Sequence, residues 1–245
     1  MSDTQRFLFN ASGTGVAGTI RAPYHQTIEG QAATCLSIDG GISTAKSERF
    51  NFRDIVHFDS AVSLVTGSFI DHENAWETLI TTRVEGLNIL HVITADAVIS
   101  RLVSKQVRAT PDKSGNLVGP EPEHLPFGSY FVNLRIAGSP IETVPGNMTT
   151  SALATFSKAS EGQAGEIIQG SLFEKVSATD KGLAVRGNVI DVPGFGRVVL
   201  GELFILRNER RLTMIRVELG CPVVGQVSVA YSHGNGTPFP PYSSK

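Results

Sequence analysis

Imidazole and carboxylate groups concentrate in one stretch of the sequence, and such groups bind divalent ions and transfer protons. His57 and Asp59 stand two positions apart, so on a β-strand their side chains project from the same face. Asp71 and His72 follow further along the chain. We therefore predict that, if this protein binds a metal ion or performs acid–base chemistry, His57, Asp59, Asp71 and His72 supply the groups.

This prediction depends on how the intervening chain folds. Ile55–Phe58 and Ala61–Ile70 have the apolar composition of strands, and the two residues between them allow a tight hairpin. In that hairpin Asp71 returns toward the start of the first strand, whereas His57 lies at the turn, on the order of 10 Å or more away. The alternative is one solvent-facing side of a hairpin followed by a polar loop, because no strict ligand spacing is present.

Two other motifs have structural explanations. Residues 13–18 match GxGxxG, but Pro23 and β-branched residues follow, so the match does not open the helix that a dinucleotide site needs. Asp96 lies between apolar residues, and an ionised carboxylate there must face water or find a partner. Arg83 and Arg101 are the cations that we expect to pair with it.

The sequence gives no signature of nucleophilic catalysis. It contains no GxSxG motif, and Cys35 and Cys221 lack the context of known nucleophilic cysteines. We expect both cysteines to be reduced and buried as small hydrophobic residues, and a bridge between the two ends of the chain is the alternative. Catalytic residues stay unknown, and no cofactor is predicted.

Composition restricts the class of protein and its partners. The chain has 245 residues, of which 41% are hydrophobic and 18% charged, and its formal net charge is -2. That balance provides no broad basic field for nucleic acid, and no apolar run is long enough for a membrane span. No signal peptide is visible, which predicts a cytoplasmic protein or one exported without a cleavable leader.

The elements that must position these groups are strands. Val192–Ala230 consists of three apolar, branched-rich runs separated by turn formers and by the charged cluster Arg207–Arg211. With 25 glycines and no helical blocks, the chain is predicted to be all-β: an antiparallel β-sandwich or barrel with little helix. The polar, Pro-rich tail after Ser232 is predicted to be extended with few hydrogen bonds.

The middle of the chain is more ambiguous. Thr81–Val107 is rich in Ala, Leu and Ile, which suits a helix, but Gly86 and the recurring β-branched residues favour two successive strands. Residues 110–128 are rich in Pro and Gly and predict a large loop or linker. We expect one all-β domain over residues 1–245, because sandwiches and barrels often reach this size undivided.

Several short motifs, in order along the chain, resemble those of the choice-of-anchor P family of bacterial surface proteins. The resemblance implies an all-β domain, and that family has no established catalytic residues to transfer. The sequence departs from it in showing neither a signal peptide nor an anchoring segment. The matching motifs are Val84–Leu102, Asn133–Ile141, Val144–Thr149, Ile190–Glu202 and Arg211–Leu219.

These observations together favour a non-catalytic structural or binding β-module that can self-associate at a surface or in an assembly. A homo-oligomer, a carbohydrate or a small molecule are the partners that this prediction allows. One alternative is a small-molecule enzyme, such as a cyclase, isomerase or hydrolase, with its site in a barrel mouth. Another is a carbohydrate-binding protein in which exposed Trp76 and Tyr24 stack on sugar rings.

Overall fold

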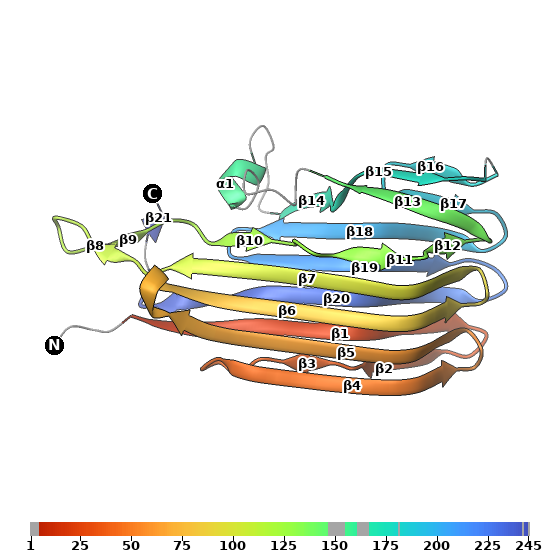
Figure 1. Ribbon diagram of the computed structural model, residues 1–245, viewed down its shortest axis with the longest axis horizontal. Helices are drawn as coiled ribbons and strands as arrows, with labels where there is room; N and C mark the ends of the chain where they lie inside the picture. Colours follow the sequence, from red (N-terminus) through yellow and green to blue (C-terminus); the bar gives the residue numbers. More distant parts are fainter. Residues whose placement is uncertain (1–4, 147–154, 161–166, 181, 242, 245) are drawn as a thin grey trace.

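The protein is a β-sandwich of two large antiparallel sheets (Figure 1). The computed structural model describes residues 5–146, 155–160, 167–180, 182–241 and 243–244. The predicted all-β class is confirmed, and of the two predicted architectures the sheets form the sandwich. In the described residues the only helical segments are the 3-10 turn η1 (Asp71–Glu73) and the short helix α1 (Phe156–Ala159).

Sheet A contains both the first strand and the last long strand of the chain. Its order is β16-β17-β18-β19-β20-β1-β2, and β14 and β3 add to β18 and β1. The strands are β1 (Arg6–Ala22), β2 (Gln26–Gln31), β3 (Thr34–Cys35), β14 (Ile167–Ser171), β16 (Ala184–Arg186), β17 (Val189–Val192), β18 (Gly196–Leu206), β19 (Glu209–Leu219) and β20 (Val224–Phe239).

Sheet B is built on a meander of four long strands. Its order is β15-β13-β12-β7-β6-β5-β4, and β10 and β11 pair with β7. The strands are β4 (Gly41–Phe52), β5 (Val56–Ile70), β6 (Ala75–Ile89), β7 (Ile93–Val107), β10 (Glu123–Leu125), β11 (Tyr130–Val132), β12 (Arg135–Ile136), β13 (Ser139–Pro145) and β15 (Phe173–Ala178). A small third sheet joins β8 (Thr110–Pro111), β9 (Leu117–Gly119) and β21 (Ser243–Ser244).

Several strands are longer than the sequence predicts. Arg6–Ala22 is one continuous strand, and so is Val56–Ile70, so the predicted hairpin turn after Phe58 is wrong. The tail is extended as predicted, but the expectation of few hydrogen bonds is wrong, because residues 233–239 belong to β20 and pair with β1. The two strands predicted within Thr81–Val107 are confirmed as β6 and β7, as are the last three long strands of the chain.

The segment predicted as a loop or linker, residues 110–128, does not separate two sheets. It contains β8, β9 and β10, and β10 pairs with β7 in sheet B. Strands before and after this segment contribute to both large sheets, so the segment is an excursion from one sandwich. Residues 147–149 of the Val144–Thr149 motif lie outside the described part of the chain.

The space between the sheets holds two hydrophobic clusters separated by a polar layer. Ser63, Thr82 and Ser100 of sheet B face Gly13 and Ser232 of sheet A. The Ser100 hydroxyl donates to Ser232 Oγ at 2.8 Å, which satisfies two buried polar groups. The larger cluster includes Phe58, Leu87, Ile93, Leu200 and Ile215, and the smaller includes Phe7, Phe9, Trp76, Ile80 and Leu102.

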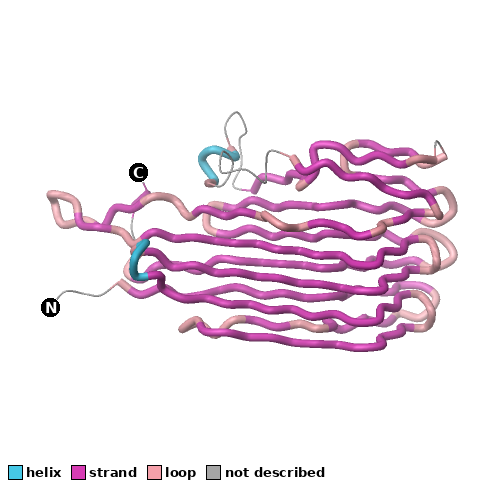
Figure 2. The backbone as a smooth tube through the Cα atoms, in the orientation of Figure 1, coloured by secondary structure: helices cyan, strands magenta, loops and turns pink. Residues whose placement is uncertain are grey.

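Both sheets carry a row of kinks that crosses their strands, where the pairing is interrupted without any change of register. In sheet B the strand pairing skips Arg49, Asp59, Gly86 and Asp96, with φ of 49° at Arg49 and 63° at Gly86. Figure 2 shows the strands stepping sideways together toward the right-hand end. In sheet A the same row passes through Gly15, Ala230, Met214 and Gly201.

Candidate functional site

The four residues predicted to bind a metal do not come together. His57 and Asp59 lie near the start of β5, and Asp71 and His72 follow its other end in η1. The strand between His57 and Asp71 spans on the order of 40 Å, so the two pairs cannot share one ion. The described residues contain no group of three or more His, Cys, Asp or Glu side chains placed to hold a metal.

Each of these residues has a local environment of its own. The Asp59 side chain packs over Gly86, where an added Cβ would lie 2.1 Å from Asp59 Oδ2. The His57 ring lies 6.3 Å from the His91 ring, and His72 lies 3.6 Å from Glu73. The physical reason for the separation is that Asp59 lies at a kink within one continuous strand, so the chain does not turn there.

The structure also corrects the expectations for the partner of Asp96 and for the burial of the two cysteines. Asp96 accepts a hydrogen bond from Asn133 Nδ2 at 2.5 Å rather than pairing with Arg83 or Arg101. Cys35 and Cys221 are free and exposed, not buried.

Trp76 and the GxGxxG match both contribute to packing between the two sheets. Trp76 is only 6% exposed and stacks on Phe7 at a centroid distance of 5.2 Å, so it cannot receive a sugar ring. The GxGxxG match lies inside β1, where a Cβ on Gly13 would lie 2.7 Å from Thr82 Oγ1. This glycine therefore permits close approach of the two sheets, which is a structural requirement and not a phosphate cradle.

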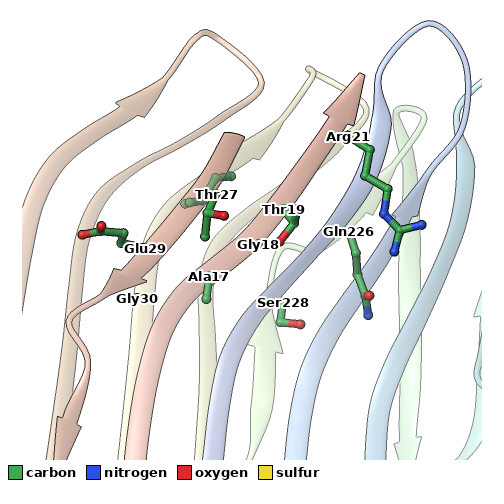
Figure 3. A pocket seen from close by; sticks show the side chains of 10 residues that line it. Ala17, Gly18, Thr19, Arg21, Thr27, Glu29, Gly30, Gln226 and Ser228 are labelled. Carbon is green, nitrogen blue, oxygen red and sulfur yellow. The ribbon is translucent and has the colours of Figure 1, made fainter. Parts of the chain in front are cut away.

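A groove lies on the outer face of sheet A, over β2, β1 and β20. It has a volume of about 520 Å³. Along the groove a bulge in β2 shifts the pairing between Val16/Gln31 and Gly18/Ile28, and small residues of β1 line its floor. Figure 3 shows the side chains that line it: Ala17, Thr19 and Arg21 from β1, Thr27 and Glu29 from β2, and Gln226 and Ser228 from β20.

The polar side chains of this first groove are available to a ligand. Arg21 and Glu29 stand on opposite sides of it, and neither forms an ion pair with another described residue (Figure 3). Gln226 lies on β20 beside Arg21, and its side chain likewise makes no hydrogen bond within the described structure. Donors and acceptors thus face solvent together, with one positive and one negative charge.

A second groove, of about 380 Å³, lies on the same face of sheet A. It forms where β14 and β17 pair with successive parts of β18 and leave a gap between their ends. In this gap the Asn188 amide donates to the Leu200 carbonyl at 2.9 Å. The lining side chains that carry hydrogen-bonding groups are Gln169, Ser171, Asn188, Arg197, Arg216 and Glu218.

Ion pairs fix the charged side chains around the second groove. Arg216 Nε and Nη2 donate to the two carboxylate oxygens of Glu202 at 2.8 and 2.9 Å, and Arg216 also bonds Glu218. The hydrogen bond to Glu202 is the main reason that the pKa of Arg216 is raised. Arg197 bonds Asp191 at 3.0 Å, and this bond raises the pKa of Arg197. A bidentate arginine–carboxylate pair holds its groups in one orientation.

The two grooves lie on the same cross-strand rows, which we call the polar band. Residues directly opposite one another on neighbouring antiparallel strands project from the same face. The six strands from β2 to β17 place the ends of the band about 24 Å apart, at about 4.8 Å per strand. One row is Thr27, Thr19, Gln226, Glu218, Arg197 and Asp191, and the other is Ala17, Ser228, Arg216, Val199 and Val189.

Sequence reasoning missed the polar band because its residues come from six strands with no shared motif. The only signal was the alternation of polar with apolar residues, as in Thr19-Ile20-Arg21 and Arg216-Val217-Glu218. Alternation predicts that these side chains face outward, but it does not predict that they become neighbours. That depends on the strand order and register, above all on the pairing of β1 with β20.

A family model described as "Domain of unknown function (DUF8256)" matches residues 7–153, more than half of the chain. No curated protein and no solved structure matches the chain. Among the described residues, no helix is both long enough and apolar enough to cross a membrane.

Proposed function

We propose that this chain, which belongs to the family of domains of unknown function DUF8256, is a non-catalytic binding module whose ligand sits on the outer face of sheet A. The observation that carries the proposal is the first groove. There Arg21, Glu29 and Gln226, from three strands, present hydrogen-bonding groups without partners in the described structure.

The chemistry of the first groove favours binding over catalysis. Its lining contains one carboxylate, Glu29, and no imidazole, thiol or second carboxylate to complete an acid–base pair. Its side chains are mostly hydroxyls, an amide and a guanidinium, which orient a ligand through directional hydrogen bonds. They stand on a sheet rather than on a long loop, and a rigid support lowers the entropy lost on binding.

Chemical-shift mapping on the ¹⁵N-labelled protein tests this proposal. The probes are small polar molecules of three charge types: neutral saccharides, carboxylates and amines. We expect at least one type to shift the amide signals of Ala17, Thr19, Gln226 and Ser228, and Arg21→Ala to weaken that binding at least fivefold.

Arg83→Ala is the matched control, because Arg83 is also exposed but lies on sheet B and pairs with Glu85. It should leave the affinity unchanged. Shifts that map only to sheet B, or the absence of shifts with every probe type, would overturn the proposal.

A further inference from the structure

We infer that the ligand is a neutral, polyhydroxylated chain of the saccharide class, and that it lies across the strands along the polar band from the first groove to the second. This inference rests on the proposed function and adds the chemical class and the direction of the ligand. It is carried by the charge of the two grooves and by their alignment on the same cross-strand rows.

Charge argues for a neutral ligand. In the first groove Glu29 would repel an anion and Arg21 would repel a cation. In the second groove Arg197 and Arg216 are already neutralised by carboxylates of the same sheet. A ligand with a net charge would have to break these ion pairs, whereas a neutral ligand leaves them intact.

Hydrogen-bonding capacity argues for hydroxyl groups. A hydroxyl donates one hydrogen bond and accepts two, so it can bond to guanidinium, carboxylate, amide and hydroxyl side chains alike. The band offers this mixture at each strand, including Thr27, Thr19, Gln226 and Glu218 in consecutive order. A chain bearing hydroxyls at regular intervals would meet a new polar side chain at every step of about 4.8 Å.

Shape argues for an extended ligand that crosses the strands. The grooves lie at the two ends of the band, and Ser228 and Arg216, which line different grooves, are directly opposite each other on β20 and β19. A small molecule would occupy one groove. A chain about 24 Å long would contact both, with the ion-paired residues of the second groove already fixed in place.

Calorimetric titration with neutral oligosaccharides of increasing length is the test. The probes are gluco-, xylo- and manno-oligosaccharides of two to eight units, with oligogalacturonate and chitosan oligomers as the charged comparisons. We expect the affinity of at least one neutral series to rise at least tenfold from the dimer to the hexamer and then to level off. The charged oligomers should bind more weakly.

Variants at the two ends of the band distinguish a chain that contacts both grooves from a ligand that contacts only one. Gln226→Ala in the first groove and Arg197→Ala in the second should each weaken hexamer binding at least fivefold, and Arg83→Ala on sheet B should not. Equal affinity for dimer and hexamer, with only Gln226→Ala having an effect, would overturn the crossing chain and leave the binding module intact. Tighter binding of a charged oligomer, or no saccharide binding by a protein whose groove binds another polar probe, would overturn the ligand class.

Discussion

His124 is a fully enclosed ionisable residue, held in β10 against β7. Its Nδ1 lies 2.6 Å from Ser104 Oγ, and its Nε2 has no hydrogen-bond partner in the described structure. Burial, reinforced by the positive charge of Arg210, lowers the pKa of His124 well below its usual value. The neutral imidazole is therefore the form that the folded state requires.

This burial predicts a loss of stability in mild acid. Because the folded-state pKa is below the unfolded value of about 6.5, the unfolded state binds the proton first as the pH falls. His124 therefore lowers the free energy of unfolding below about pH 6.5, by up to about 1.4 kcal/mol per pH unit, until its folded-state pKa is reached. Urea titrations at pH 7.5, 6.0 and 5.0 measure the effect. In His124→Asn the free energy of unfolding should depend less on pH. If it falls with pH as steeply as in the unaltered protein, His124 is not the group responsible.

Single residues also show why the sequence predicted some features and missed others. Trp76 lies in the polar stretch DHENAWET, which suggested an exposed ring. On β6, however, it shares the inner face with Thr78, Ile80 and Thr82, so the buried face is itself partly polar. Hydrophobic patterning cannot identify the inner face of a strand when threonines occupy it.

Among the elements, β20 departs most from its predicted form. Gly234 and Gly236, together with the three prolines that follow them, made the end of this strand look like a loose tail. In the structure the Phe7 ring fills the space beside Gly236, where a Cβ would lie 2.4 Å from Phe7 Cε1. Gly236 thus makes room for an aromatic residue of β1, whereas Gly234 lies against Ile80 of sheet B, and neither reason appears until the strands are paired and the sheets packed.

This pairing predicts that truncation of β20 is destabilising. A chain ending after Asn235 loses the partners of β1 from Arg6 to Phe9 and uncovers the Phe7 ring. We expect the free energy of unfolding to fall by about 2–4 kcal/mol, from lost ladder hydrogen bonds and apolar burial. A chain ending after Pro240 keeps all of β20 and serves as the control. Equal melting temperatures for the two truncated chains would contradict this role.

At the scale of the whole molecule, composition was enough to predict the all-β class, but it left sandwich and barrel equally open. That choice depends on whether the outer strands close on each other. Here β2 and β3 of sheet A meet β4 of sheet B through side chains only: Thr34 with Ser43 at 2.6 Å and Gln31 with Ser47 at 3.0 Å. Side-chain pairs between edge strands leave little trace in a sequence. The resemblance to choice-of-anchor P proteins stays a prediction.

The arrangement of the sheets also separates the two thiols. Cys35 pairs with Ser12 on β1, whereas Cys221 precedes the start of β20, opposite the far end of β1, on the order of 30 Å away. We expect two thiol equivalents to react with Ellman's reagent in the native protein. Cys35→Ser and Cys221→Ser should each remove one equivalent without changing the melting temperature. A thiol that reacts only after denaturation would contradict its exposed position.

The row of kinks restricts where the chain can change in length during evolution. Along each strand it reverses which residues face inward, and it does so at the same height on neighbouring strands. Inserting or deleting one residue between a kink and the nearest turn would put a single strand out of phase with its neighbours. Length variation among relatives should therefore be confined to the turns and to the excursion over residues 110–128, while the number of residues between kink and polar layer stays constant in each strand.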